Sequence, residues 1–252
     1  MNRLKFAGRY ALRHLLLSLA VAALSAAAVF GLWYPMPWRA MLGVGAIYGL
    51  ILAVDVVCGP LLTLILSSPR KSLRERVVDF SLIGIVQLAA LLYGLHAVWA
   101  ARPVVLGFEV DRLVVVTANE VQTDQLASAP AGLRRLPWWG VQRVGTRRPK
   151  DSAEMLKSVE LGMDGISLVM QPGWWAPWPD ALPALRKRAK PLTELIARRP
   201  ERADALRRAA ADAGLPVERL TYLPLTSSKT LDWVALLDAK LDVVGWAPVD
   251  GF

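Results

Sequence analysis

Asp55 is an ionisable side chain inside a segment that is otherwise fit for a lipid bilayer, "LAVDVVCGPLLTL" (52–64). A charged carboxylate at the bilayer centre costs at least about 2.5–3.5 kcal/mol, so such a residue normally faces protein and finds a partner. Gln87 is the candidate partner within the chain, because it lies at a similar depth in the next apolar run. The spacing therefore predicts that Asp55 and Gln87 meet.

Three roles for Asp55 are compatible with the sequence. Pro60 removes the amide that would bond to the Val56 carbonyl and should bend the helix, so a protonated Asp55 can satisfy that carbonyl and clamp two helices. Asp55 can instead contact the transmembrane helix of a partner. A proton relay or catalysis needs further reactive groups at the same depth as Asp55. Asp79 is too near the start of the third apolar run to be a second catalytic aspartate. A packing or partner-binding role is favoured.

The other reactive residue types give little support for an enzyme. Cys58 is the single cysteine, and His14 and His96 are the two histidines, so a His/Cys metal cluster is not expected. Residues 103–252 contain no histidine and no G-x-S-x-G, phosphate-loop or H-E-x-x-H motif. The basic run "RKRAKPLTELIARR" (186–199) is interpreted as a solvated helical face. We expect no cofactor, no metal, no nucleic acid and no catalytic residue.

Three apolar runs must position these residues. They cover about 14–34, 41–68 and 77–101, and each is long enough to cross the hydrocarbon core. Residues 1–102 are therefore expected to form a membrane domain of three transmembrane helices, and residues 103–252 a separate domain. An alternative treats the first run as a cleaved signal peptide, because it has a basic start and small residues at 24–28.

The positive residues predict the orientation. Four precede the first run and four fill the loop between the second and third runs, whereas the loop between the first and second runs holds only Arg39. Because Lys and Arg concentrate in cytoplasmic loops, the N-terminus should be cytoplasmic and the C-terminal domain should lie across the membrane. In a Gram-negative bacterium this means an inner-membrane protein with a periplasmic domain.

Small residues on two of the runs predict faces for close helix packing. The third run places Gly84, Gln87 and Gly94 on one face, and the second run contains Gly45-x-x-x-Gly49. With Asp55, Gly59 and Pro60, these positions are the candidates for helix contact or for binding a partner's helix.

The C-terminal domain is expected to be α+β with a small, mostly antiparallel sheet. A hairpin is predicted around Glu109–Arg112, a helix over 152–164 capped by Asp151 or Ser152, helices over 179–213 broken at prolines, and a second hairpin turning near 238–240. Two aromatic clusters either cover the core or, if exposed, act as interaction anchors or dip into the membrane interface. They contain Trp138, Trp139, Trp174, Trp175 and Trp178.

The chain resembles the type IV pilin accessory proteins of the TfpX/TfpZ kind. The motifs that carry this resemblance are "YPMPW" (34–38), "VDVVCGPLLTLIL" (54–66), "DFSLIGIVQLAALLYG" (79–94), "ARPVVLGFEVDRLVVVTANEV" (101–121) and, more loosely, "YLPLTSSKTLDWVALLD" (222–238). Residues 134–190 depart from the pattern. Further positions that match it are Lys71, Asp79, Arg102, Pro103, Phe108 and Arg112.

The resemblance implies an inner-membrane factor for pilus assembly that acts on pilin as a chaperone and is not an enzyme. Its expected partners are the transmembrane helix and the periplasmic head of pilin, membrane lipids, and other pilus-assembly proteins. Two alternatives stay open: a membrane-embedded enzyme that modifies pilin or envelope glycan, and a structural subunit of an envelope transport complex.

Overall fold

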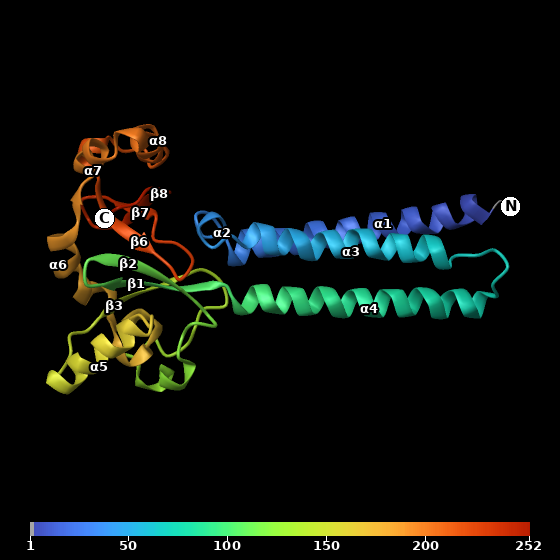
Figure 1. Ribbon diagram of the computed structural model, residues 1–252, viewed down its shortest axis with the longest axis horizontal. Coiled ribbons are helices and arrows are strands. Elements are labelled where there is room, and N and C mark those ends of the chain that lie inside the picture. Colours follow the sequence, from blue (N-terminus) through green and yellow to red (C-terminus); the bar gives the residue numbers. More distant parts are fainter. Residues whose placement is uncertain (1–2) are drawn as a thin grey trace. The chain divides into compact units, whose positions relative to one another are not determined.

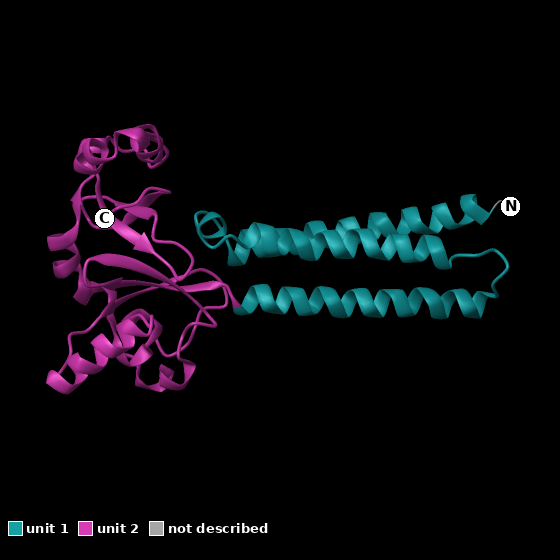
Figure 2. Ribbon diagram, in the orientation of Figure 1, with its two compact units in different colours: residues 1–100 teal, residues 101–252 magenta. Residues whose placement is uncertain are grey.

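A computed structural model describes residues 3–252 and divides the chain into two compact units, Met1–Ala100 and Ala101–Phe252 (Figure 1, Figure 2). We call them the N-terminal unit and the C-terminal unit and describe each by itself. The N-terminal unit is helical, and the C-terminal unit combines one sheet with several short helices. This confirms the predicted fold class, a helical membrane bundle followed by an α+β domain.

The N-terminal unit contains three helices that are long and apolar enough to cross a membrane. They are α1 (Arg3–Ala28), which continues as the π-helical turn η1 (Val29–Trp33), α3 (Val44–Leu66) and α4 (Leu73–Ala100), with the short helix α2 (Trp38–Met41) between the first two. Both α1 and α4 begin earlier than the apolar runs predicted. At α4 the reason is a capping box, in which Ser72 and Glu75 satisfy each other's backbone amides.

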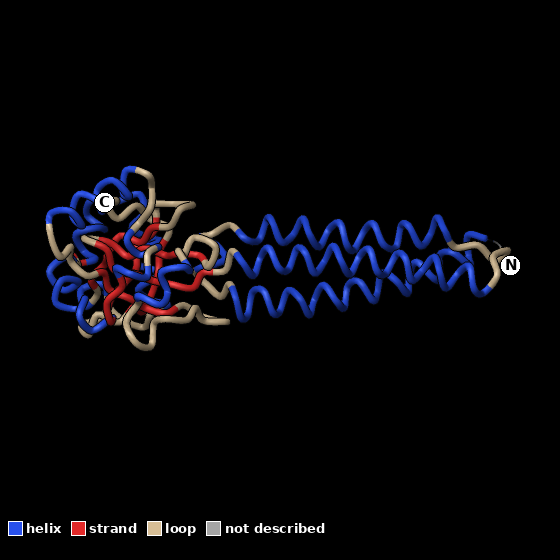
Figure 3. Tube along the Cα trace, turned by 90° about the horizontal axis from the view of Figure 1, so that it is seen from below, coloured by secondary structure: helices blue, strands red, loops and turns tan. Residues whose placement is uncertain are grey.

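The three long helices run side by side (Figure 3). Near one end they enclose a small core of Val29, Tyr34, Val44, Tyr48 and Val98. Two hydrogen bonds of buried hydroxyls stabilise this core: Ser25 Oγ and Tyr48 Oη are 2.6 Å apart, and Tyr34 Oη donates to the Val98 carbonyl at 2.9 Å. Hydrogen bonds of this kind join helices in an environment where apolar surface supplies little driving force.

The C-terminal unit is built on one eight-stranded sheet in the order β4-β3-β1-β2-β6-β7-β8, with β5 paired to β6. Most neighbours are antiparallel, as predicted, but β1·β3 and β2·β6 are parallel. The strands are β1 (Pro103–Glu109), β2 (Arg112–Thr117), β3 (Gln142–Thr146), β4 (Trp175–Pro177), β5 (Lys190–Pro191), β6 (Thr221–Thr226), β7 (Trp233–Leu237) and β8 (Val243–Ala247).

Several of the predicted local elements are confirmed. The hairpin β1–β2 turns at Val110-Asp111, and β7–β8 turns over 238–242. The helices are α5 (Ser152–Met163), α6 (Trp178–Arg188), α7 (Leu192–Arg198) and α8 (Ala203–Asp212), with the 3-10 turns η2 (Thr123–Ser128), η3 (Leu168–Met170), η4 (Pro172–Trp174), η5 (Pro200–Arg202) and η6 (Val217–Arg219).

The break predicted at Pro183 is wrong, because α6 continues through it. The amide that Pro183 lacks would have bonded to the carbonyl of residue 179, which belongs to the exposed first turn of α6. The helix therefore loses one bond at a point where water reaches the backbone.

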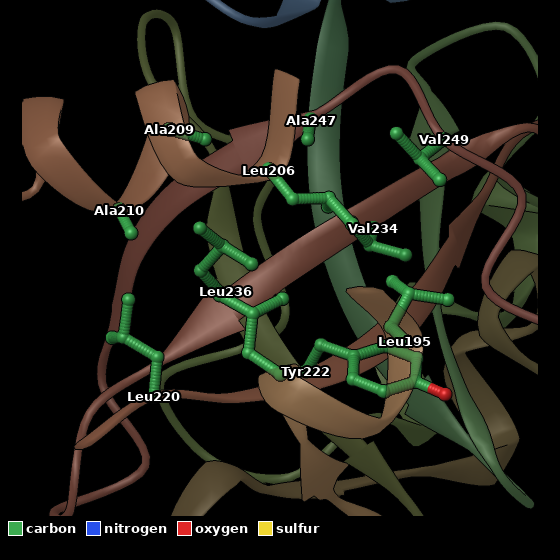
Figure 4. Close-up of a cluster of buried hydrophobic side chains, with 11 residues drawn as sticks. Leu195, Leu206, Ala209, Ala210, Leu220, Tyr222, Val234, Leu236, Ala247 and Val249 are labelled. Atoms are coloured by element: carbon green, nitrogen blue, oxygen red, sulfur yellow. The ribbon is translucent and has the colours of Figure 1, made fainter. Parts of the chain in front are cut away.

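Two hydrophobic clusters hold the two halves of the sheet. One lies where α7 and α8 pack beside β6, β7 and β8, and Leu236, Tyr222 and Leu206 are fully buried in it (Figure 1, Figure 4). The other covers β1, β2 and β3 and includes Val105, Val144 and Trp175. The halves join through the short parallel pairing of Leu113 and Val114 with Leu225 and Thr226.

Candidate functional site

Asp55 and Gln87 meet between α3 and α4. Gln87 Nε2 donates to the backbone oxygen of Asp55 at 2.9 Å and to its Oδ1 at 3.2 Å. The equal depths of the two residues predicted this contact. Within the described residues 3–252, Gln87 Oε1 is buried and has no hydrogen-bond partner. The pair thus carries an unsatisfied acceptor that is buried against Gly59.

Gly59 creates the space that Gln87 occupies. A Cβ added at Gly59 would lie 2.1–2.4 Å from the side-chain amide of Gln87, far closer than non-bonded atoms approach. Helix α3 stays helical through Pro60 to Leu66, so the proline does not end it. The Asp55–Gln87 contact requires glycine at position 59, because any side chain there would displace the Gln87 amide.

A cavity of about 170 Å³ opens beside this pair between α1, α3 and α4. Its polar part combines Asp55 and Gln87 with His14 and Ser18, two residues one helical turn apart on α1. His14 Nδ1 also lies 2.6 Å from Thr63 Oγ1. The lining residues are His14, Leu17, Ser18, Val21, Asp55, Gly84, Gln87, Leu88 and Leu91. We call this cavity the intramembrane pocket.

His14 and Ser18 were not among the predicted site residues. Their spacing of four residues, which puts two polar side chains on one face of an apolar helix, was the available signal. The pocket offers hydrogen-bond donors and acceptors within an apolar surround. Such a site suits a polar group carried into the membrane by another helix.

The candidate glycines divide into two groups. Gly94 packs against α3, since an added Cβ would lie 2.8–3.3 Å from the Ile51 side chain. Added Cβ atoms at Gly45, Gly49 and Gly84 would meet nothing within 4 Å among the described residues 3–252. These three glycines do not serve close packing within that part of the chain, so they remain candidates only for contact with a partner.

Replacing Gly59 with alanine is expected to destabilise the helical unit by about 1–3 kcal/mol, the usual cost of overpacking, because the new methyl displaces the Gln87 amide from Asp55. Thermal unfolding of the full-length protein in detergent measures this. Gly49→Ala is the matched control, since its methyl enters open space. The double variant Gly59→Ala, Gln87→Ala should regain most of the loss. Equal stability of the two single variants would contradict the packing assignment.

The remaining matched positions of the family pattern have structural contacts. Lys71 Nζ forms an ion pair with Asp79 Oδ2 at 2.5 Å next to the start of α4. Phe108 is buried in β1, whose first residue is Pro103. Arg112 pairs with Asp111 in the hairpin turn, and its guanidinium lies 4.5 Å from the Phe252 ring centroid.

Arg102 is also a structural residue. It is buried, and its Nη2 donates to the carbonyl of Pro137 at 2.8 Å. Its own carbonyl accepts a hydrogen bond from the amide of Ala118. Arg102 therefore ties the first strand of the C-terminal unit to the segment that precedes Trp138.

For two of the tryptophans the structure supports the core alternative and excludes them as interaction candidates. Trp174 and Trp175 are 5% and 2% exposed, and Trp175 Nε1 donates to the Val169 carbonyl at 2.8 Å. They belong to the core and are unavailable to a partner. Trp178 is half-buried with Arg143 5.5 Å from its ring centroid. Trp138 and Trp139, in contrast, are 70% and 71% exposed.

The C-terminal unit has a second cavity, of about 490 Å³, next to the β1–β2 turn. It is lined mostly by small and apolar residues, with Glu109 held by Ser167 Oγ and by the Leu168 amide. The lining residues are Glu109, Val110, Arg112, Val114, Ser158, Gly162, Gly165, Ile166, Ser167, Met170, Thr226, Ser227, Ser228 and Leu231. Because Ser158 and Gly162 belong to α5, this helix forms one wall.

Helix α5 presents exposed apolar side chains: Met155, Leu156, Val159 and Met163. It is fixed at its start instead of along its length. Asp151 Oδ1 accepts a hydrogen bond from the Glu154 amide at 2.8 Å. The Arg147 guanidinium donates two hydrogen bonds of 2.8 Å to the Glu154 carboxylate. These side-chain bonds and the amide of Lys150 hold the N-terminus of α5.

Protonation of Glu154 is expected to release α5. Hydrogen bonds from the Arg147 guanidinium, and next from the Lys150 amide, lower the pKa of Glu154 from 4.5 to about 2. Since the folded-state pKa is depressed, the stabilisation is present above pH 4.5 and disappears as the pH falls through about 2.

Hydrogen exchange of α5 in the full-length protein, corrected for the intrinsic exchange rate, measures this loss. The wild type should lose protection across that pH window. Glu154→Gln should show weak protection throughout, and Glu160→Gln, on the exposed side of the same helix, should follow the wild type. A pH-independent difference between wild type and Glu154→Gln would contradict the assignment.

Comparison with known proteins identifies the family. A fimbrial assembly protein of serogroup I from Dichelobacter nodosus is 36% identical over 252 residues, which is 100% of this chain and 98% of that protein. The chain belongs to the fimbrial assembly protein family. The serogroup E1 protein of the same organism is 34% identical over the same shares, and the protein of serogroups C1 and C2 is 44% identical over 128 residues, 51% of this chain and 98% of its own length.

The family model of the fimbrial assembly protein FimB matches residues 2–43, most of which form α1 and α2. No solved structure matches the chain. The relatives confirm the assignment to a type IV pilus assembly family that the sequence motifs predicted. Because the first two relatives extend over the full chain, the family includes both the helical unit and the C-terminal unit.

Proposed function

We propose that this protein is an inner-membrane assembly factor that binds type IV pilin and acts as a pilin-specific chaperone. Membership of the fimbrial assembly protein family supports a role in pilus biogenesis. The observation that carries the binding role is the intramembrane pocket, where Gln87 holds a buried acceptor without a partner in residues 3–252. A polar group of a pilin transmembrane helix would enter this pocket and, with the Gln87 amide turned away from Gly59, would supply the missing donor.

The helix surfaces fit the same proposal. Gly49 and Gly84 leave open space on α3 and α4, so another helix can approach the backbone closely. Four basic residues precede the first apolar run and four lie between α3 and α4. By the positive-inside rule, these ends lie in the cytoplasm and the C-terminal unit lies in the periplasm, on the side of the pilin head.

The C-terminal unit offers a surface for that head. The exposed apolar side chains lie on the same helix, α5, as Ser158 and Gly162, which line the 490 Å³ cavity. Exposed apolar surface of this kind is typical of a protein–protein contact. We therefore assign α5 and the adjoining cavity to the pilin head, and the intramembrane pocket to the pilin helix.

Site-specific photo-crosslinking in cells tests the proposal. A photoreactive residue at Gly84, which lines the intramembrane pocket, is expected to give an adduct with pilin, and one at Leu24, an exposed position on α1, is the matched lipid-facing control. Deleting the gene should reduce surface pili. Normal pili in the deletion strain, or equal adducts from both positions, would refute the proposal.

A further inference from the structure

The segment between Ala129 and Gln142 carries two large aromatic side chains into solvent. Trp138 and Trp139 are 70% and 71% exposed, although Leu133 and Leu136 of the same segment pack against the second hydrophobic cluster. The backbone is held in place, since Arg134 Nε donates to the Ala129 carbonyl at 3.0 Å. We call residues 130–141 the tryptophan loop. Its base is anchored, and its tip presents the two indoles.

The tryptophan loop is tied to the point where the chain leaves its last membrane helix. Arg102 Nη2 donates to the Pro137 carbonyl at 2.8 Å. Arg102 follows Ala100, the last residue of α4, by two positions, and two residues span at most about 7 Å. The covalent chain and one hydrogen bond therefore keep Pro137, and with it Trp138, within a side chain's reach of the membrane exit.

The charge around the loop suits an anionic surface. Residues 125–150 contain six Lys and Arg and no Asp or Glu, and two of the six, Arg143 and Arg147, form ion pairs with Asp242 and Glu154. Among the six basic residues, Arg134 and Arg135 lie in the tryptophan loop itself and are exposed. Tryptophan prefers the headgroup level of a bilayer, and each basic residue near an anionic leaflet contributes about 1 kcal/mol.

We propose that the tryptophan loop inserts Trp138 and Trp139 into the interface of the bilayer, with Arg134 and Arg135 on the phosphates of anionic phospholipids. The occupant of this surface is the membrane, on the side where α4 ends. The loop acts as a second anchor that restrains the C-terminal unit at the membrane surface. This role is independent of pilin binding, because it uses neither the intramembrane pocket nor α5.

Spin-label accessibility in the full-length protein tests the loop directly. In a Cys58→Ser background, a nitroxide is attached at Trp139→Cys or at Leu231→Cys, an apolar position outside the loop that is 58% exposed. The protein is placed in nanodiscs containing phosphatidylglycerol. The ratio of collisions with oxygen to collisions with a water-soluble nickel chelate is expected to be several-fold higher at position 139. Equal ratios would overturn the proposal.

Two further experiments show whether lipid or pilin shields the label at position 139 from water. Arg134→Gln with Arg135→Gln, or nanodiscs of neutral phosphatidylcholine alone, should lower the ratio at position 139 toward that at position 231. If the label is water-accessible in lipid and becomes shielded only when pilin is added, the loop is a protein contact and the lipid assignment is wrong. Protection in lipid without pilin supports the membrane anchor.

Discussion

Replacing Asp55 with leucine is expected to abolish surface pili while leaving the protein at its normal level. The variant removes Oδ1, which accepts from Gln87 at 3.2 Å, but Gln87 keeps its bond to the backbone oxygen at 2.9 Å. Hydrogen bonds between membrane helices are worth about 0.6 kcal/mol on average, so the helical unit should stay folded. The loss is expected in partner binding.

Asp55→Leu should weaken pilin binding more than it weakens folding. A polar group of pilin that enters the pocket would be buried there without the hydrogen-bond partner that Asp55 provides. A buried polar group left without its partner costs about 1–3 kcal/mol. This corresponds to about a 5- to 150-fold loss in affinity for pilin. Sheared surface pili, quantified by immunoblotting against the level of the protein itself, provide the measurement.

Asp55→Asn is the control that separates binding from chemistry. Asparagine keeps the volume and the acceptor oxygen but cannot transfer a proton. We expect nearly normal pili in this variant. If Asp55→Asn loses pili as completely as Asp55→Leu, the carboxyl group acts through its charge or its proton, and an enzymatic or relay role replaces the binding role. If both variants are normal, the pocket does not serve assembly.

Replacing Leu236 with alanine is expected to lower the free energy of unfolding of the C-terminal unit by about 2–5 kcal/mol. Leu236 is fully buried in β7, between β6 and β8, and belongs to the cluster with Tyr222 and Leu206 (Figure 4). Truncation leaves a cavity that strands paired on both sides cannot close. The effect should be large because most small domains are stable by only about 5–15 kcal/mol.

Pulse proteolysis of the full-length protein in increasing urea reports the stability of the C-terminal unit. Leu231→Ala is the matched control, since Leu231 is an exposed leucine near the same strand. It should change the midpoint little. A similar midpoint for Leu236→Ala and Leu231→Ala would show that the cluster does not hold the sheet together, and that the other hydrophobic cluster dominates.

Local elements of the fold followed from the sequence because their causes are local. The turn residues between β1 and β2 and the cap at Asp151 are decided within a few residues by backbone preferences and nearby hydrogen bonds. The contact of Asp55 with Gln87 followed from equal depth in two adjacent helices. The helix break predicted at Pro183 was wrong, because the effect of a proline depends on where in the helix the lost hydrogen bond lies.

Burial decided the roles of the tryptophans, and the sequence does not contain that information locally. Trp174-Trp175 and Trp138-Trp139 are both paired indoles near proline and glycine, yet the first pair is buried and the second is exposed. Trp175 belongs to the hydrophobic cluster that covers β1, β2 and β3, whereas Trp138 and Trp139 are not part of it. Membership of this cluster depends on contacts between segments far apart in the chain.

Three features were predictable from the amino-acid pattern alone: the three membrane helices, the α+β character of the C-terminal unit and the position of a carboxylate within an apolar helix. These depend on hydrophobic length, on periodicity and on the cost of burying charge, which are properties of single segments. Two other features are visible only in the folded chain: His14 and Ser18 share a pocket with Asp55, and Arg102 holds the tryptophan loop. Both arrangements require side chains from separate segments to converge, and long-range packing alone specifies that convergence.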